Sequence, residues 1–262
     1  MPNFQALGID VGSTTTKIVA LDAQGYMAWH LLEDAEPLVE QQVERLLNEA
    51  CHINGDLVDI PLVATGYGRG LVKQATRQIT EITCHAQGIY QELGHGGTLV
   101  DIGGQDSKVI RISDQGKVVD FAMNDKCAAG TGRFLENTAR RLKVPLDQMG
   151  QEALSAPEEV TITSTCTVFA ESEVISLLAH GIAVAPILRG LHRSLLKRIV
   201  AMIRMVGFVP PLMLSGGVVK NPAVRQMLAE DIGHEAILPR HPQLTGAYGA
   251  ALLARSTLDG QS

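Results

Sequence analysis

The sequence lacks the features that would assign it to several large protein classes. It has no long run of Lys or Arg and a formal net charge of -6, so the basic surface expected of a nucleic-acid binder is missing. No apolar stretch reaches the roughly 18 residues that suggest a membrane span. The N-terminal residues MPNFQALGIDVG have neither the basic nor the apolar region of a signal peptide. We therefore expect a cytoplasmic protein that binds neither nucleic acid nor membranes.

Aromatic residues, paired cysteines and the common nucleotide fingerprints are also scarce or absent. Aromatics make up 4 % of the 262 residues and hydrophobic residues 45 %, with 26 glycines, which favours an α/β protein with an aliphatic core and many tight turns. Neither GxxxxGK[ST] nor GxGxxG occurs, so a P-loop or Rossmann site is disfavoured. The four cysteines include no CxxC pair, which disfavours a zinc ribbon, and disulfides are rare in a reducing compartment.

One sequence pattern is present twice. The apolar run Ala6–Asp10 ends in Asp-Val-Gly and is followed, after a polar turn, by a second run, Lys17–Asp22. The pattern restarts at Thr98–Asp101, which ends in Asp-Ile-Gly-Gly and precedes Lys108–Ile112. Both copies predict a β-hairpin with Asp-x-Gly at its turn.

The remaining periodicities predict alternating helices and strands. Further strands are expected at 26–32, 61–64, 118–122 and 211–214, and helices at 36–51, 131–142, 169–179, 184–206 and 244–254. Together these predict two related α/β subdomains, 1–95 and 96–262, with a ligand cleft between them. The last helix is one that could pack back on the first subdomain.

The first turn, GIDVGSTTTK, has the chemistry of a phosphate site. Gly12 lets an anion approach the backbone N–H groups, and Lys17 offers a positive charge. Asp10 beside phosphates would need an intervening cation, which predicts a catalytic role with hydrated Mg²⁺. Hydroxyl donors come from Ser13, Thr14 and Thr15.

The second turn, DIGGQDSK, repeats this logic, and a third element, LSGGVVKNP, follows downstream. Asp101 corresponds to Asp10 and Lys108 to Lys17, while Gln105 is a candidate for positioning the attacking water. Backbone approach is expected at Gly103 and Gly104. Adenine and ribose are expected against the third element, at Gly216, Gly217, Lys220 and Asn221. The predicted ligands are therefore ATP or ADP with Mg²⁺.

Two cysteines stand just before predicted helices. Cys127 lies in NDKCAAGTGRFLE and Cys166 in STCTVFAESEVISLLAHG. Helix N-termini lower a thiol pKa and stabilise anions, so both can be thiolates, although small apolar residues packed at helix starts would give the same pattern. Cys51 and Cys84 are interpreted as structural.

Taken together, GIDVGSTTTK, LVDIGGQDSKV and MLSGGVVKNP resemble the ATPase fold of actin, hexokinase and heat-shock chaperones. The cysteine segments are similar to those of the activator ATPases of 2-hydroxyacyl-CoA dehydratases, a family that includes benzoyl-CoA reductase subunits. The resemblance implies a homodimer bridged by one [4Fe–4S] cluster on Cys127 and Cys166. It also implies a ferredoxin or flavodoxin as electron donor and a dehydratase as acceptor.

Two other functions fit the nucleotide motifs. A small-molecule kinase of the sugar-kinase type would share them but would not need Cys127 or Cys166. A regulatory nucleotide-binding module without catalysis would share them as well. The iron content of anaerobically purified protein separates the first function from both alternatives.

Overall fold

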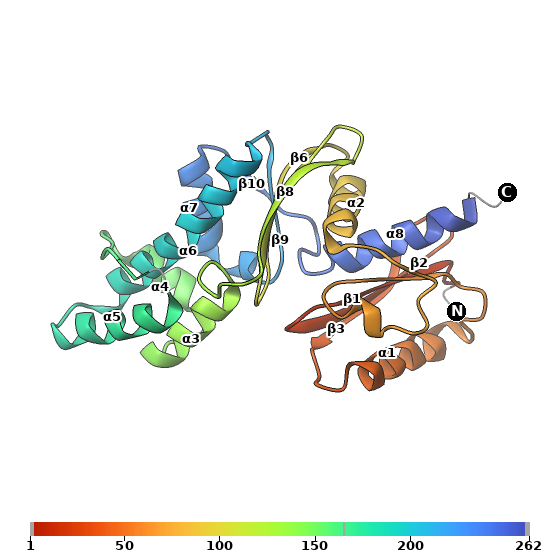
Figure 1. Cartoon of the computed structure of the whole chain (residues 1–262), viewed down its shortest axis with the longest axis horizontal. Coiled ribbons are helices and arrows are strands. Elements are labelled where there is room, and N and C mark those ends of the chain that lie inside the picture. The colour runs from red at the N-terminus through yellow and green to blue at the C-terminus, as the bar shows by residue number, and fades with distance from the viewer. Residues whose placement is uncertain (1–2, 165, 260–262) are drawn as a thin grey trace. The chain divides into compact units, whose positions relative to one another are not determined.

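The computed structural model describes residues 3–164 and 166–259. The chain divides into two compact units. Unit 1 comprises Met1–Gly96, Ile112–Val118 and Pro239–Ser262, and unit 2 comprises Gly97–Arg111 and Val119–Leu238. Each unit is built on one five-stranded sheet (Figure 1).

Unit 1 has the sheet order β3-β2-β1-β4-β5. Its strands are β1 (Ala6–Val11), β2 (Thr15–Leu21), β3 (Met27–Asp34), β4 (Leu62–Thr65) and β5 (Arg77–Gln78). Its helices are α1 (Val39–Asn54), the 3-10 turn η1 (Arg69–Leu71), α2 (Glu81–Leu93) and α8 (Thr245–Asp259).

Helices cover both faces of β1, which explains why every residue of this strand is buried. Because side chains alternate along a strand, Leu7 and Ile9 pack with α1, whereas Ala6 packs with α8 (Figure 1). Gly8 lies on the α8 side, where a Cβ would stand 2.2 Å from Ala247 O. Asp10 continues this second face, so its carboxylate points toward the α8 side of the sheet.

Unit 2 has the sheet order β10-β9-β6-β7-β8. Its strands are β6 (Gly97–Ile102), β7 (Ser107–Ile112), β8 (Val118–Asn124), β9 (Leu212–Ser215) and β10 (Ala236–Ile237). Its helices are α3 (Gly132–Leu142), α4 (Met149–Ser155), α5 (Thr167–Ala179), α6 (Val184–Val206), the 3-10 turn η2 (Val218–Lys220) and α7 (Pro222–Ile232). One large apolar core joins β6, β7 and β9 to these helices.

The two sheets share one topology when β6 is aligned with β1. In unit 1, β1 pairs in parallel with β4, which places Asp10 opposite Thr65. In unit 2, β6 pairs in parallel with β9, which places Asp101 opposite Ser215. The α/β class, expected from the composition, and the relation between the two halves, expected from the repeated hairpin, are confirmed.

The predicted strands and helices are confirmed to within a few residues at their ends, and α6 matches to the residue. Helices α2, α4 and α7 and strands β5 and β10 were not among the predicted elements. In α2 the buried residues Ile82, Ala86 and Ile89 do recur at helical spacing, but Cys84, His85 and Gly88 are buried with them and weaken the aliphatic pattern that marks a helix. Among the described residues, no helix is both long and apolar enough to span a membrane.

Candidate functional site

The first predicted site turn joins β1 to β2 in unit 1. Asp10 and Lys17 are register partners, and Lys17 Nζ lies 3.2 Å from Asp10 Oδ2. Asp10 is only 5 % exposed, and a carboxylate at such depth needs a cation or hydrogen bonds to stay ionised. The structure thus brings the predicted acid and its positive partner together at one strand end.

The backbone of this turn is closed by a hydrogen bond, and the residue at its tip is exposed to solvent. Gly12 N donates to Thr15 O at 3.1 Å, and a Cβ at Gly12 would lie 2.9 Å from that same oxygen. Ser13 is exposed, while Thr14 and Thr15 are half-buried. All six residues predicted for this turn therefore lie in one hairpin, with small groups around an acidic centre.

Three residues that the motif analysis did not assign to the site surround the Asp10 carboxylate. A Cβ at Gly66 would lie 2.3 Å from Asp10 Oδ1, so only glycine fits there. A Cβ at Gly246 would lie 3.1 Å from Asp10 Oδ2 and 2.9 Å from His85 Nε2. His85 of α2 is therefore a neighbour of the acidic centre. No sequence signal marks it, because its proximity arises from the packing of α2 on α8.

The second predicted turn lies between β6 and β7 and has the same ion pair. Lys108 Nζ lies 3.3 Å from Asp101 Oδ2 and 2.7 Å from Asp106 Oδ2. Ser215 Oγ donates to Asp101 Oδ1 at 2.7 Å. Asp106 thus holds the lysine and closes the turn through Gly103 N, which donates to Asp106 O. Gln105 is exposed at the tip.

The two acidic centres differ at one oxygen. Asp101 Oδ1 accepts the Ser215 hydroxyl, whereas Asp10 Oδ1 faces the bare backbone of Gly66. Glycine follows the register partner in both units, and Gly216, like Gly66, has a positive φ. The repeat therefore extends to the loop after the fourth strand of each unit.

The third predicted element follows β9, and its residues have different environments. Gly216 approaches Ile102 O so closely that a Cβ would lie 2.3 Å from it. Lys220 is exposed. Asn221 caps α7, with Oδ1 accepting from Ala223 N at 2.9 Å, and its Nδ2 lies 2.9 Å from His192 Nε2. Asn221 therefore organises the loop, and its predicted contact with nucleotide stays a prediction.

Both candidate ligand cysteines stand at helix starts, as predicted. Cys166 is the N-cap residue of α5 and is exposed. Cys127 is half-buried four residues before Thr131, the N-cap of α3, and Asn124 Nδ2 donates to its carbonyl at 2.9 Å. An ion pair of 3.0 Å between Arg141 and Glu171 links the two helices.

The other two cysteines have different surroundings. Cys84 is fully buried, and burial raises the pKa of its thiol to about 12, so this group stays protonated. Cys51 Sγ lies 3.8 Å from Gly55 O at the end of α1. Within residues 3–164 and 166–259, no group of three or more His, Cys, Asp or Glu side chains is placed to hold a metal ion.

The second turn is bonded directly to the helix that follows Cys127. Gly132 N donates to Gly103 O at 2.9 Å, and Arg133 N donates to Gly104 O at 2.8 Å. The first N–H groups of a helix have no partner within it, so α3 uses the glycine turn as its N-terminal acceptor. A shift of this turn therefore acts on the start of α3.

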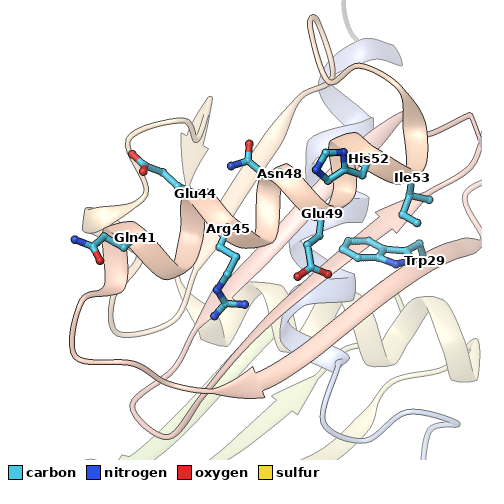
Figure 2. A pocket seen from close by; sticks show the side chains of 8 residues that line it. All are labelled: Trp29, Gln41, Glu44, Arg45, Asn48, Glu49, His52 and Ile53. Carbon is cyan, nitrogen blue, oxygen red and sulfur yellow. The ribbon is translucent and has the colours of Figure 1, made fainter.

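A separate open groove of about 660 Å³ lies between β3 and α1 in unit 1. Figure 2 shows its side chains projecting from α1, with the Trp29 ring from β3. Arg45, near its centre, is held by Glu33 and Glu36. The groove contains none of the predicted site residues and no glycine turn, so it is not the nucleotide site expected from the sequence.

His192, which contacts Asn221 in the loop after β9, should make the stability of the fold sensitive to acid. His192 is fully buried, its Nδ1 lies 2.7 Å from Leu188 O and its Nε2 faces the Asn221 amide. Burial lowers its pKa below the ordinary value. Below about pH 6.5 the unfolded chain binds a proton at this residue more readily than the folded chain does. The free energy of unfolding therefore decreases as the pH is lowered.

We expect His192→Gln to reduce the loss of stability between about pH 7.5 and pH 5.5, since one proton accounts for at most about 1.4 kcal/mol per pH unit. Denaturant unfolding at both pH values measures the difference. His52→Gln, at an exposed position of α1, is the matched control. An equal loss in wild type and His192→Gln would contradict the prediction.

Comparison with known proteins agrees with this geometry. The chain is 43 % identical over 260 residues to the activator of lactoyl-CoA dehydratase from Anaerotignum propionicum, covering 95 % of this chain and 96 % of the relative. It is 40 % identical over 256 residues to the (R)-2-hydroxyglutaryl-CoA dehydratase activating ATPase of Acidaminococcus fermentans, covering 96 % and 97 %.

Solved structures show the same likeness. The activator of 2-hydroxyisocaproyl-CoA dehydratase from Clostridium difficile, with bound ADPNP, superposes with a TM-score of 0.90 at 38 % identity and covers 98 % of this chain and 96 % of that one. A ROK family glucokinase from Streptomyces griseus, at 14 % identity and a TM-score of 0.62, shares the fold alone. The profile of one family matches residues 7–254, and the chain belongs to that family, the BadF/BadG/BcrA/BcrD ATPases.

Proposed function

We propose that this protein is an ATP-dependent electron-transfer activator of a 2-hydroxyacyl-CoA dehydratase. The observation that carries the proposal is the pair of hydrogen bonds from Gly132 and Arg133 to the glycine turn at 103–104. These bonds make the proposed phosphate turn and the helix after Cys127 one connected element. The relatives named as dehydratase activators support the partner class.

In this proposal, Asp10 and Asp101 have different roles. Asp10, a carboxylate at the strand end beside the glycine turn and paired with Lys17, would hold the water shell of Mg²⁺. Asp101 is fixed by Ser215 and Lys108, and the exposed Gln105 would orient the attacking water. Phosphates would bind the open hairpin at 12–15 and Gly103–Gly104, and adenosine the loop at 216–221.

The thiols of Cys127 and Cys166 are suited to bind an iron–sulfur cluster. Cys166 is exposed at the N-cap of α5, and Cys127 is half-buried four residues before the N-cap of α3, whereas the buried Cys84 is not available. A [4Fe–4S] cluster is held by four thiolates and supplies one-electron chemistry at low potential. With two ligands from each chain, the site would be completed by a second copy on a two-fold axis.

An apolar strip on α5 supports a homodimer at this end of the molecule. Val168 and Phe169 are each 67 % exposed, and Ile175 and Leu178 are exposed as well. Val168 and Ile175 are seven residues apart and Leu178 three further on, so they share one helix face. Cys166 is the N-cap residue of the same helix, so the exposed apolar side chains and the proposed cluster ligand belong to one element.

Coupling would pass through the second turn. Nucleotide binding at Gly103 and Gly104 shifts their carbonyl groups, and the two hydrogen bonds carry that shift to the start of α3. The electron would come from a ferredoxin or flavodoxin and go to the dehydratase. ATP can bias this transfer only through its different affinity for the two conformations.

The first prediction of the proposed function concerns ATP hydrolysis. We expect Asp10→Asn and Asp101→Asn each to lower Mg²⁺-dependent ATP turnover by at least about tenfold, because each removes a charge that organises the phosphoryl site. Phosphate release measures the rate, and circular dichroism checks the fold. Asp59→Asn, in the exposed loop before β4, is the control. Turnover unchanged in both site variants would show that the site is assigned wrongly.

The second prediction concerns iron. Anaerobically purified protein should be a brown dimer with about four irons, and Cys127→Ser or Cys166→Ser should lose the iron. Cys51→Ser should keep it, because this thiol lies on α1. Iron analysis and size-exclusion chromatography measure both properties. Dimers that keep their iron in both ligand variants would refute this ligation, and iron-free wild type would favour a kinase or regulatory module.

The third prediction concerns coupling. The rate at which a chelator removes iron, or the reduction potential, should differ between nucleotide-free protein and protein with an ADP–metal fluoride. A Cβ at Gly132 would stand 3.1 Å from Gly103 O, so Gly132→Ala should weaken this nucleotide dependence while hydrolysis continues. A chelation rate and potential that are the same in every nucleotide state would rule out gating, even with ATPase activity and iron confirmed.

A further inference from the structure

Glu173 of α5 is bonded to the segment that precedes Cys166. Its Oε1 accepts from Thr163 N and from Thr163 Oγ1, both at 2.9 Å, and its Oε2 accepts from Ser164 N at 2.8 Å. One carboxylate therefore satisfies two consecutive backbone N–H groups and a hydroxyl. No sequence motif assigns this role, because Glu173 follows the cysteine by seven residues.

These bonds keep the carboxylate charged. Burial by itself raises the pKa of Glu173, but the hydrogen bonds from Thr163 and Ser164 outweigh burial and lower the pKa to about 2. A carboxylate that accepts several N–H bonds is stabilised as the anion. Glu173 is thus a fixed negative charge at any working pH, beside the segment that leads to Cys166.

The backbone around Cys166 is therefore held on both sides. Downstream, Cys166 O accepts from Ala170 N at 2.9 Å as α5 begins. Upstream, Glu173 holds residues 163–164. Cys127 has a comparable but weaker arrangement, in which the neutral Asn124 amide donates to its carbonyl. A polar side chain thus bonds Cys127 itself in one segment and residues 163–164 in the other, and only the second of these side chains, Glu173, is charged.

We propose that Glu173 is a positioning residue that holds the Cys166 thiolate in place for the cluster and, as a fixed anion, lowers the cluster's reduction potential. The inference rests on the proposed cluster ligation. Without the carboxylate, two backbone N–H groups and a hydroxyl lose their acceptor, so the segment loosens and Cys166 is a less secure ligand. Removal of the negative charge also makes addition of an electron easier.

Glu173→Gln tests the inference, because it keeps the side chain's shape but replaces one accepting oxygen by an amide donor. Glu171→Gln is the matched control: it lies on the same helix and removes the same charge, but Glu171 pairs with Arg141 instead of the cysteine segment. Thr163→Val removes one of the three bonds and leaves the charge, which separates positioning from electrostatics.

Three measurements give the outcome. In cluster-free protein, amide hydrogen exchange of a peptide covering residues 160–166 should speed up in Glu173→Gln and not in Glu171→Gln. In the loaded protein, Glu173→Gln should release iron to a chelator at least about tenfold faster, and Thr163→Val less so. The reduction potential should rise in Glu173→Gln; a tenfold change in the reduction equilibrium corresponds to about 59 mV for one electron.

The outcomes distinguish the proposed cluster from the proposed role of Glu173. Wild-type protein that binds no iron would overturn the proposed cluster. Wild-type protein that binds iron, with a Glu173→Gln variant of unchanged exchange, chelation rate and potential, would overturn the role of Glu173 alone. Equal effects of Glu173→Gln and Glu171→Gln would also overturn it, since they would reflect charge or helix stability in general.

Discussion

The structure depends on a buried ion pair at the end of the first strand of each sheet. Asp10 with Lys17, and Asp101 with Lys108, place a carboxylate where almost no water reaches. A charge in that position is tolerated only with a close partner of opposite sign, and the hairpin register provides one in the next strand. Around Asp10 this burial goes with bare backbone, which explains the glycines at 66 and 246.

In unit 2 this centre is tied to a helix as well as to a strand. The turn at 103–106 closes on Asp106, and its glycine carbonyls accept the first N–H groups of α3. A helix start without such acceptors would leave donors unsatisfied. Turn and helix are therefore hydrogen-bonded into one element, and Cys127 lies four residues before the N-cap of that helix. In the proposed function, this element would be the connection between nucleotide and thiol.

The four cysteines have different environments in the fold. Burial keeps the Cys84 thiol protonated, and Cys51 lies on α1 of unit 1. Cys127 and Cys166 start two helices that are joined by the Arg141–Glu171 ion pair. Asn124 bonds the carbonyl of Cys127, and Glu173 bonds residues 163–164 ahead of Cys166, while neither thiol is fully buried.

The sequence by itself determined the repeated hairpin, the two acidic turns, the glycine loop after β9 and the helices that follow the two cysteines. These features are local: alternation of apolar residues, an Asp-x-Gly at a strand end and a helix start can all be read within about ten residues. Tertiary structure alone decided that His85 and Gly246 border Asp10, that Asn221 is used by His192 and α7, and that Glu173 holds the segment before Cys166. Each of these depends on contacts between segments distant in sequence or on a hydrogen bond that no pattern encodes, because side-chain partners are chosen by packing and by the need to satisfy buried polar groups.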